Sequence, residues 1–316
     1  MSYRGQNLRV QIGDGATATP TVVYDPVGGS VSFTPKTTYA RPATHAVDRG
    51  TPTRARSAMM RAFDLAFGIH LLYETPAILK PALGAVSTAT KTHTFRAAVG
   101  GTPALFAAEV DYGDDIANSR IAQSVRVKSF TIAIPANDFA TITCETTALA
   151  VTSETAKTAL SESTPRTYVH GADCTTLTLN SVNLLSGGLA QSLTFNVDNN
   201  VEPKYGLGSL NPAASNNLGQ RTVTADLVVH VNAATYDDYR TLHEAGTEVT
   251  LSAVFTSGAN TMTFTLRGAI VSEPAEPVGS DTGLISLTIK LEGRQTASAD
   301  AFDIVVVNDN TDAFAN

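Results

Sequence analysis

The chain has 316 residues, of which 43% are hydrophobic and 16% are charged, and its formal net charge is −7 at pH 7. This length and apolar content are enough for about two packed domains, and the low charged fraction fits a chain that buries much of its surface against other subunits. The acidic balance argues against a nucleic-acid-binding protein, because such a protein needs basic residues that displace counterions from phosphate.

The charge is distributed unevenly along the chain. Residues 1–150 contain 14 Lys and Arg against 11 Asp and Glu, whereas residues 151–316 contain 8 against 18. The first half therefore carries +3 and the second half −10. Halves of opposite charge can attract each other between subunits, although ordinary variation of a protein surface gives the same pattern.

The first residues of the chain contain no apolar segment of the kind found in secretion signals. No apolar run approaches the ~20 residues of a transmembrane helix. We therefore expect a protein that is made in the cytosol and has no membrane segment.

The first half begins with a predicted strand around Val31 and Phe33, a long loop over residues 35–57, and a strand in which apolar residues alternate up to Phe67. A helix is predicted over residues 69–80, short or broken because it contains Pro76. The remaining strands of this half are expected around Phe95 and over residues 105–110, 125–134 and 139–151.

The first long loop carries a cluster of arginines. These are Arg41, Arg49, Arg54 and Arg56, with Arg61 just beyond them. A nucleic-acid site is a poor explanation because no aromatic residues are interleaved with them. Arginine is enriched where carboxylates of another subunit are bound, so the cluster favours an interface. A charged, flexible loop is the alternative.

Between the halves, residues 152–167 are rich in Thr, Ser and Glu and are typical of a linker. We therefore predict domains over residues 1–160 and 161–316. Cys144 and Cys174 form no CxxC pair, so two free thiols are expected, with a disulfide left open.

An acidic group precedes this linker. It consists of Asp111, Asp114 and Asp115 around a glycine. Carboxylates of this kind can hold a hard cation such as calcium, and a solvated turn is the simpler alternative.

The second half is the more regular one. Period-two alternation predicts strands over residues 193–197, 222–231, 248–256, 262–266 and 285–291. Residues 198–220 are rich in Asn, Gly, Pro and Ser and are expected to form a loop, which at this length is usually functional or disordered. A helix is predicted over residues 233–245, with Asn232 as its N-cap and Gly246 at its end. Residues 257–260 have the composition of a hairpin turn.

Each half thus contains a strand, a long loop, a strand, a short helix and further strands. The shared order indicates a duplicated unit. The fold class predicted is mainly β: two tandem β-sandwich or half-barrel domains, each with one short helix and one long loop.

Residue patterns typical of enzymes are not found. None of the six histidines stands at metal-ligand spacing, and His243-Glu244 is not followed by the second histidine of a zinc-protease helix. The sequence contains no GxSxG elbow, phosphate loop or dinucleotide fingerprint. We therefore expect no enzymatic activity, no cofactor and no bound metal.

Residues 192–208 and 218–226, with the helix and strands that follow, resemble the C-terminal half of phage tail tube proteins, also called major tail proteins. In that family a strand ends in an Asn-rich turn, and a loop with Pro, Tyr and Gly leads to the next strand. Residues 57–67 and 129–151 are similar to the first half of the same family. The departures are Pro76 and a C-terminal tail after Arg294.

The resemblance implies a structural virion protein in a long-tailed phage. Its copies would form rings, three chains with pseudo-sixfold symmetry or else six chains, and the rings would stack into a tube through which DNA passes without specific binding. A tail terminator, a baseplate or tip and a tape measure protein are the implied partners. The candidate contacts between subunits or rings lie in the two long loops: Arg41, Arg49, Arg54, Arg56, Glu202, Lys204, Tyr205, Asn216, Asn217 and Arg221.

Other classes remain open at this point. The chain could be another ring component of a virion, such as a terminator or baseplate protein. It could also be a tandem β-sandwich module that binds a surface, although such a protein would need a secretion route. A hydrolase on a β scaffold would need a set of acid, base or nucleophile that the sequence does not supply.

Overall fold

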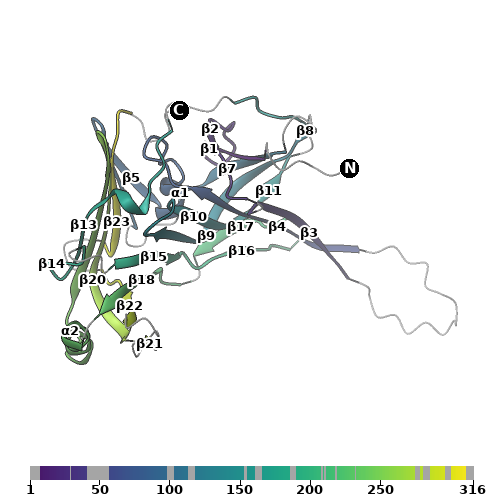
Figure 1. Ribbon diagram of the computed structural model, residues 1–316. Coiled ribbons are helices and arrows are strands. Elements are labelled where there is room, and N and C mark those ends of the chain that lie inside the picture. The colour runs from purple at the N-terminus through teal and green to yellow at the C-terminus, as the bar shows by residue number, and fades with distance from the viewer. Residues whose placement is uncertain are drawn as a thin grey trace, which may run out of the picture.

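The computed structural model shows a mainly β chain whose strands pair antiparallel, as the sequence predicted (Figure 1). The structure describes residues 8–28, 30–40, 57–97, 103–112, 118–152, 155–160, 166–185, 190–207, 209, 211–217, 219–231, 233–274, 278–279, 285–295 and 300–310.

One long sheet, which we call the central sheet, contains strands of both halves. Its order is β3–β4–β10–β9–β15–β18–β22–β20, and β21 continues the edge of β20 along β22. These strands are β3 (Ser32–Ala40), β4 (Ser57–His70), β9 (Ile121–Pro135), β10 (Thr141–Ala148), β15 (Ala190–Asp198), β18 (Thr222–Val231), β20 (Asn260–Pro274), β21 (Val278–Gly279) and β22 (Ile285–Glu292).

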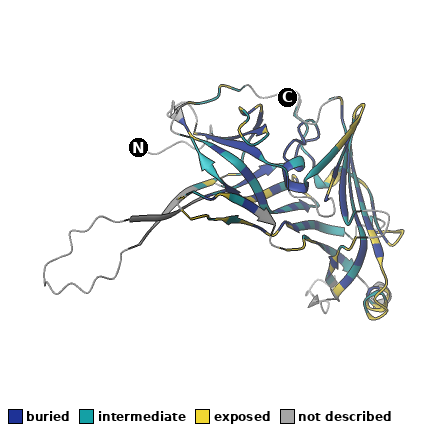
Figure 2. Cartoon of the chain, turned by 180° about the vertical axis from the view of Figure 1, so that it is seen from behind, coloured by how far each residue is buried: buried dark blue, intermediate teal, exposed yellow. Residues whose placement is uncertain are grey.

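Two flanking sheets pack against the central one. The first has the order β2–β1–β7–β9–β11 and the second the order β14–β13–β19–β20–β23–β6–β5. Their further strands are β1 (Arg9–Asp14), β2 (Val22–Tyr24), β5 (Ala85–Ala89), β6 (Thr92–Arg96), β7 (Phe106–Asp111), β11 (Ala150–Val151), β13 (Cys174–Leu179), β14 (Val182–Asn183), β19 (Val249–Ser257) and β23 (Phe302–Val307). Most of the residues coloured as buried in Figure 2 lie on the strands of these sheets and on α1 (Leu79–Leu83).

The strand order of the two halves is the same. In the central sheet, β3–β4–β10–β9 corresponds to β15–β18–β22–β20, and β9 and β20 each have 15 residues. Both of these strands pair in a flanking sheet at their beginning and in the central sheet at their end. Their bulges also correspond. The bulge of β9 lies opposite Glu145/Thr146 of β10, and the bulge of β20 lies opposite Lys290/Leu291 of β22. The β5–β6 hairpin has no counterpart among the described strands of the second half.

The two halves are joined by direct strand pairing. Ser192–Asp198 of β15 pairs with Ser129–Pro135 of β9, which makes the central sheet continuous across the predicted linker. In the second flanking sheet, β23 lies between β6 of the first half and β20 of the second. We call the β9–β15 contact the internal seam.

The core of the second half is built around stacked aromatic rings. Phe195 of β15 lies 5.5 Å from Phe264 and 4.9 Å from Phe302, measured between ring centroids. All three side chains are fully buried. Because Phe302 starts β23, the segment predicted to be a tail after Arg294 in fact contains a core strand. That prediction was wrong because β23 is short and mostly buried, so its sequence lacks the apolar and polar alternation by which the other strands were recognised.

The first predicted helix is largely strand and irregular chain. Strand β4 continues to His70, and α1 is only five residues long. The intervening residues do not become helical because neighbours bond their backbone: Leu71 N–H donates to Ala140 O at 2.9 Å, and Tyr73 N–H to Thr167 O at 3.1 Å. The Tyr24 hydroxyl also accepts from Ile78 N–H at 3.1 Å.

The second predicted helix is confirmed. Helix α2 covers Ala233–Glu244, and Gly246 after it has φ of +58°, a left-handed conformation that glycine adopts without strain. Asn232, the predicted N-cap, lies outside the described residues. The hairpin at residues 257–260 is also confirmed, because Ser257 pairs with Asn260 and Gly258 has φ of +61°.

Two segments predicted to lack structure are partly ordered. Residues 198–220 contain a hairpin of β16 (Val201–Lys204) and β17 (Ala214–Asn217). The predicted linker contributes β12 (Thr155–Ala156), which pairs with β8 (Asn118–Ser119). Just beyond it, Thr158 N–H donates to the buried Glu109 carboxylate at 3.1 Å, so this part of the linker packs against the first flanking sheet.

We expect Ile304→Ala in β23 to destabilise both halves together. Ile304 is fully buried and pairs with Phe95 on one side and Phe264 on the other, so the cavity should cost about 2–5 kcal/mol of unfolding free energy. Urea unfolding measures the loss, and hydrogen exchange should accelerate in β6 as well as in β20. Val305→Ala, at a half-buried position of the same strand, is the control. Faster exchange confined to β20 would contradict the expectation.

Candidate assembly surfaces

The ten predicted contact residues divide into two groups. Arg41, Arg49, Arg54 and Arg56 belong to the connection between β3 and β4 and lie outside the described residues. The other six belong to the β16–β17 hairpin or its base: Glu202, Lys204, Tyr205, Asn216, Asn217 and Arg221.

The β16–β17 hairpin presents charge at its surface. Glu202 pairs with Asn216 across the hairpin, and Glu202 and Lys204 are both exposed. The turn between the strands carries Leu207, which is fully exposed. A fully exposed leucine beside charged residues is typical of a contact that forms only with a partner.

Arg221 has a role inside the chain. Its Nε donates to Asn199 Oδ1 at 2.6 Å, and the buried Asn199 donates to Ala82 O at 3.0 Å and to Val127 O at 3.1 Å. Burial lowers the pKa of the Arg221 guanidinium, while the charge of Asp300 acts in the opposite direction. These bonds fix the base of the hairpin to β9 and to the end of α1.

The hairpin lies beside β4. Burial raises the pKa of the Tyr205 hydroxyl, and the negative charge of Asp64 on β4 adds to this effect. Arg126 of β9 donates a hydrogen bond to Ser215 O in β17. The β3–β4 strands and the β16–β17 hairpin therefore extend toward the same end of the molecule (Figure 1). We call this the tip end.

One face of the central sheet is polar. Alternate residues such as Phe130, Phe195 and Leu227 are buried, and most of the residues between them are Thr, Ser, Asn or charged. The described acidic residues of this face outnumber its basic ones: Asp64, Glu145, Asp198, Asp226 and Glu292 against Arg126 and Lys290.

Hydrogen bonds on this polar face cross the internal seam. Thr131 Oγ1 of β9 donates to Asn196 Oδ1 of β15 at 2.9 Å, and Asn196 Nδ2 donates to Asp226 Oδ2 of β18 at 3.3 Å. Side-chain ladders of this kind fix the register of neighbouring strands. The face is therefore a wet, acidic and well-ordered surface.

The central sheet ends in two strands with one open side each, within the described residues. Strand β3 pairs with β4 alone, and the last part of β20 pairs with β22 alone. Open edges of sheets bind other strands readily. In the repeated strand order these two edges correspond to β15 and β9, the strands of the internal seam.

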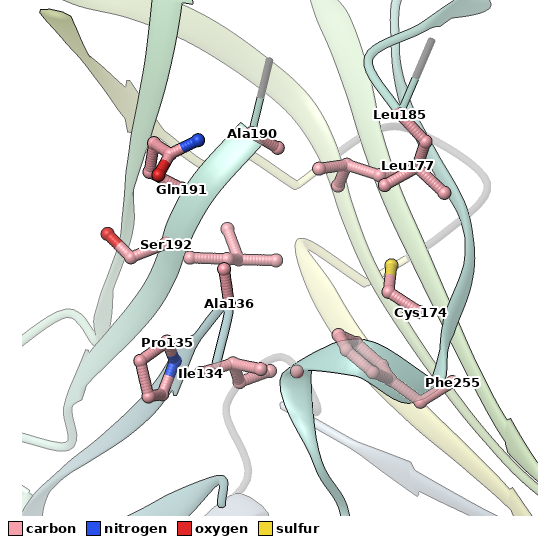
Figure 3. A pocket seen from close by; sticks show the side chains of 12 residues that line it. Ile134, Pro135, Ala136, Cys174, Leu177, Leu185, Ala190, Gln191, Ser192 and Phe255 are labelled. Atoms are coloured by element: carbon pink, nitrogen blue, oxygen red, sulfur yellow. The ribbon is translucent and has the colours of Figure 1, made fainter. Parts of the chain in front are cut away.

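A pocket lies at the other end of the molecule from the tip end (Figure 3). It is bounded by the end of β9, the start of β15, and strands β13 and β19, and its walls are apolar: Ile134, Leu177, Leu185, Leu193 and Phe255, with the thiol of Cys174. No local pattern predicts this pocket, because its residues come from four separate segments.

The wall of the pocket is fixed by a close backbone approach. A Cβ at Gly171, in the short 3-10 helix Gly171–Asp173 before β13, would lie 1.9 Å from Pro135 O. Glycine is therefore required there. Partial burial raises the pKa of the Cys174 thiol to about 11, which keeps it neutral and unreactive at physiological pH.

The acidic group, for which a cation site and a solvated turn were both considered, is only partly described. Asp111 is buried and its carboxylate lies 3.1 Å from Lys157 Nζ, whereas Asp114 and Asp115 lie outside the described residues. Within the part of the chain that the structure covers, no three His, Cys, Asp or Glu side chains gather as metal ligands would. Cys144 and Cys174 are free thiols.

Among the described helices, none is long and apolar enough to cross a membrane. No curated protein matches the sequence. The family model described as "Phage tail tube protein" matches residues 9–301, which is most of the chain. The match includes the central sheet, the first flanking sheet, the β16–β17 hairpin, and the second flanking sheet except for β23. The chain therefore belongs to the phage tail tube protein family, a family of structural virion proteins of the phage tail.

Proposed function

We propose that three copies of this chain close into a ring of pseudo-sixfold symmetry, and that the rings stack into the tail tube through which genome DNA leaves the virion. The observation that carries the proposal is the repeated strand order with its internal seam. Two equivalent units per chain supply a pseudo-sixfold arrangement with three chains. Six chains per ring is the competing count.

The internal seam supplies a template for the contact between chains. Within one chain, β9 of the first unit pairs with β15 of the second. The equivalent open strands, β20 and β3, would pair in the same way between neighbouring copies. Closing a ring through these strands leaves no open edge in the central sheet.

The template also gives a register. Glu273 corresponds to Ser129, because both stand at the central-sheet bulge. Phe33 of β3 and Phe195 of β15 occupy matching places opposite β4 and β18. Lys36 and Asp198 each follow three residues later, so they correspond to each other. In the seam Ser129 is opposite Asp198, so Glu273 would be opposite Lys36 of the next copy, an attractive pair of charges.

The polar face of the central sheet is the proposed wall of the bore. Its Thr, Ser and Asn side chains hold water, and its carboxylates repel phosphate. DNA would therefore slide past without being held, whereas a basic wall would bind it. The tape measure protein would occupy this bore before ejection, and a terminator and a baseplate or tip would cap the tube. Synthesis in the host cytoplasm would precede assembly into the virion.

The ring proposal is tested first by the mass of the assembled ring. Native mass spectrometry of the purified protein should give a species of three times 33.1 kDa. Negative-stain images should show rings or tubes with a central hole and apparent sixfold symmetry. A species of six times the chain mass would show a six-chain ring instead. A protein that stays monomeric at all concentrations and salt conditions would overturn ring formation by the chain alone.

We expect Lys36→Glu to weaken ring closure and the double variant Lys36→Glu/Glu273→Lys to restore it. The single change places two like charges opposite each other at every contact between chains, at a cost of about 0.2–1 kcal/mol for each contact. Sedimentation velocity at low salt measures the concentration at which rings appear. Lys91→Glu, on the β5–β6 turn, is the control. Failure of the charge swap to restore rings would show that this register is wrong.

We expect Thr143→Lys to slow DNA ejection while tubes still assemble. Thr143 is exposed on the polar face at the centre of β10, so the change adds a ring of positive charges to the proposed bore. Ejection from phage particles is followed by the fluorescence of a DNA-binding dye, at two salt concentrations. Thr143→Gln has similar bulk without the charge and serves as the control. Equal ejection rates for both variants would place this face outside the bore.

A further inference from the structure

The two ends of the molecule differ in shape and in apolar surface. The pocket includes Ala190–Leu193 at the start of β15, and the β16–β17 hairpin follows Asp198 at the end of the same strand. A strand of this length separates them by roughly 30 Å. We call the pocket end the base end. The tip end projects a fully exposed leucine, and the base end has an apolar hollow.

The ends also differ in charge. The base end includes the β9–β10 turn, the 3-10 helix and α2, which lies on this side of the molecule in Figure 1. Its described charges are mainly acidic: Asp138, Asp173, Asp237, Asp238, Glu244 and Glu248 against Arg240. The tip end carries both signs instead: Arg126, Lys128, Lys204 and Arg221 together with Asp64, Asp198, Glu202 and Asp300.

We propose that the base end of one copy receives the tip end of a copy in the adjacent ring, with Leu207 seated in the pocket. The proposal rests on the proposed tube and identifies the surfaces that stack the rings. The occupant is a second copy of this chain because a single molecule presents both members of the pair. One is an apolar side chain on a hairpin that carries Lys204 and bonds to Arg126, and the other is an apolar hollow with an acidic rim.

The geometry of this contact produces an open stack. The two surfaces are different and lie at opposite ends, so each copy uses its tip end on one neighbour and its base end on another. A contact of this kind does not close on itself along the axis, and it gives every ring the same direction. The pocket provides the apolar anchor, and the opposite charges guide the approach and lose strength as salt rises.

The pocket is suited to a branched aliphatic side chain. It has about 360 Å³ of space between atoms, part of it open to solvent, and its lining is almost wholly apolar. Figure 3 shows Leu177, Leu185 and Phe255 directed toward this space, with Gln191 and Ser192 at its margin. The close approach at Gly171 holds the wall in place without a partner, so little ordering is needed on binding.

Replacing Leu207 tests the proposal directly. Leu207→Asp would place a carboxylate in an apolar pocket with an acidic rim, which is unfavourable. The concentration needed for stacking should therefore rise at least tenfold, while single rings still form. Leu207→Met is the matched control and should stack as the native protein does. Electron microscopy and light scattering distinguish rings from tubes. Leu207→Asp tubes that form at the native concentration would overturn the proposal, whereas a native protein that forms no rings would instead overturn the proposed function.

A crosslink identifies the receiving surface. Leu207→Cys in one preparation and Gln191→Cys in another, both with Cys174→Ser, are mixed before assembly and treated with a short bis-maleimide. A crosslinked pair of chains should appear in tubes and be missing from single rings. Tubes that yield no such pair would show that Leu207 meets another surface. A pair of equal yield in single rings would show that the contact lies within a ring and would equally overturn the proposal.

Discussion

The structure depends on the antiparallel pairing of β9 with β15. This seam joins the end of one unit to the beginning of the next, so that two copies of one strand order form a single sheet. Main-chain bonds set the spacing of the seam, and the Thr131–Asn196–Asp226 ladder sets its register. The strands equivalent to those of the seam, β3 and β20, are the two open edges of the central sheet. The contact proposed between chains therefore needs no new kind of surface.

The two directions of assembly would use different physical chemistry. Around the ring, backbone groups of strand edges would pair, which gives a fixed register. Along the axis, a leucine and a pocket would supply burial, and unlike charges would supply direction. Much of the acidic excess of the second half lies, in the fold, at the base end of the molecule. The acidic surface there would also oppose stacking of rings base to base.

Segments with strong local patterns could be predicted from sequence, and segments defined by distant partners could not. Thr222–Val231 alternates over its whole length, and the predicted strand has the observed bounds. Residues 69–80 contain apolar residues at helical spacing, yet their backbone bonds to β10 and to residue 167, which no local pattern reveals. The pocket was missed for the same reason. Among the predicted contacts, Arg221 has a role inside the chain that only the position of Asn199 explains.

Strand β23 has a consequence for synthesis of the protein. Its partner β6 is made roughly 200 residues earlier, and at typical rates of translation it would wait roughly 10–40 s for β23 to emerge. During that time the first half has an unpaired edge and cannot complete its second flanking sheet. A nascent chain therefore lacks one core strand until β23 is made, and in the proposed assembly such an incomplete subunit would not join a ring.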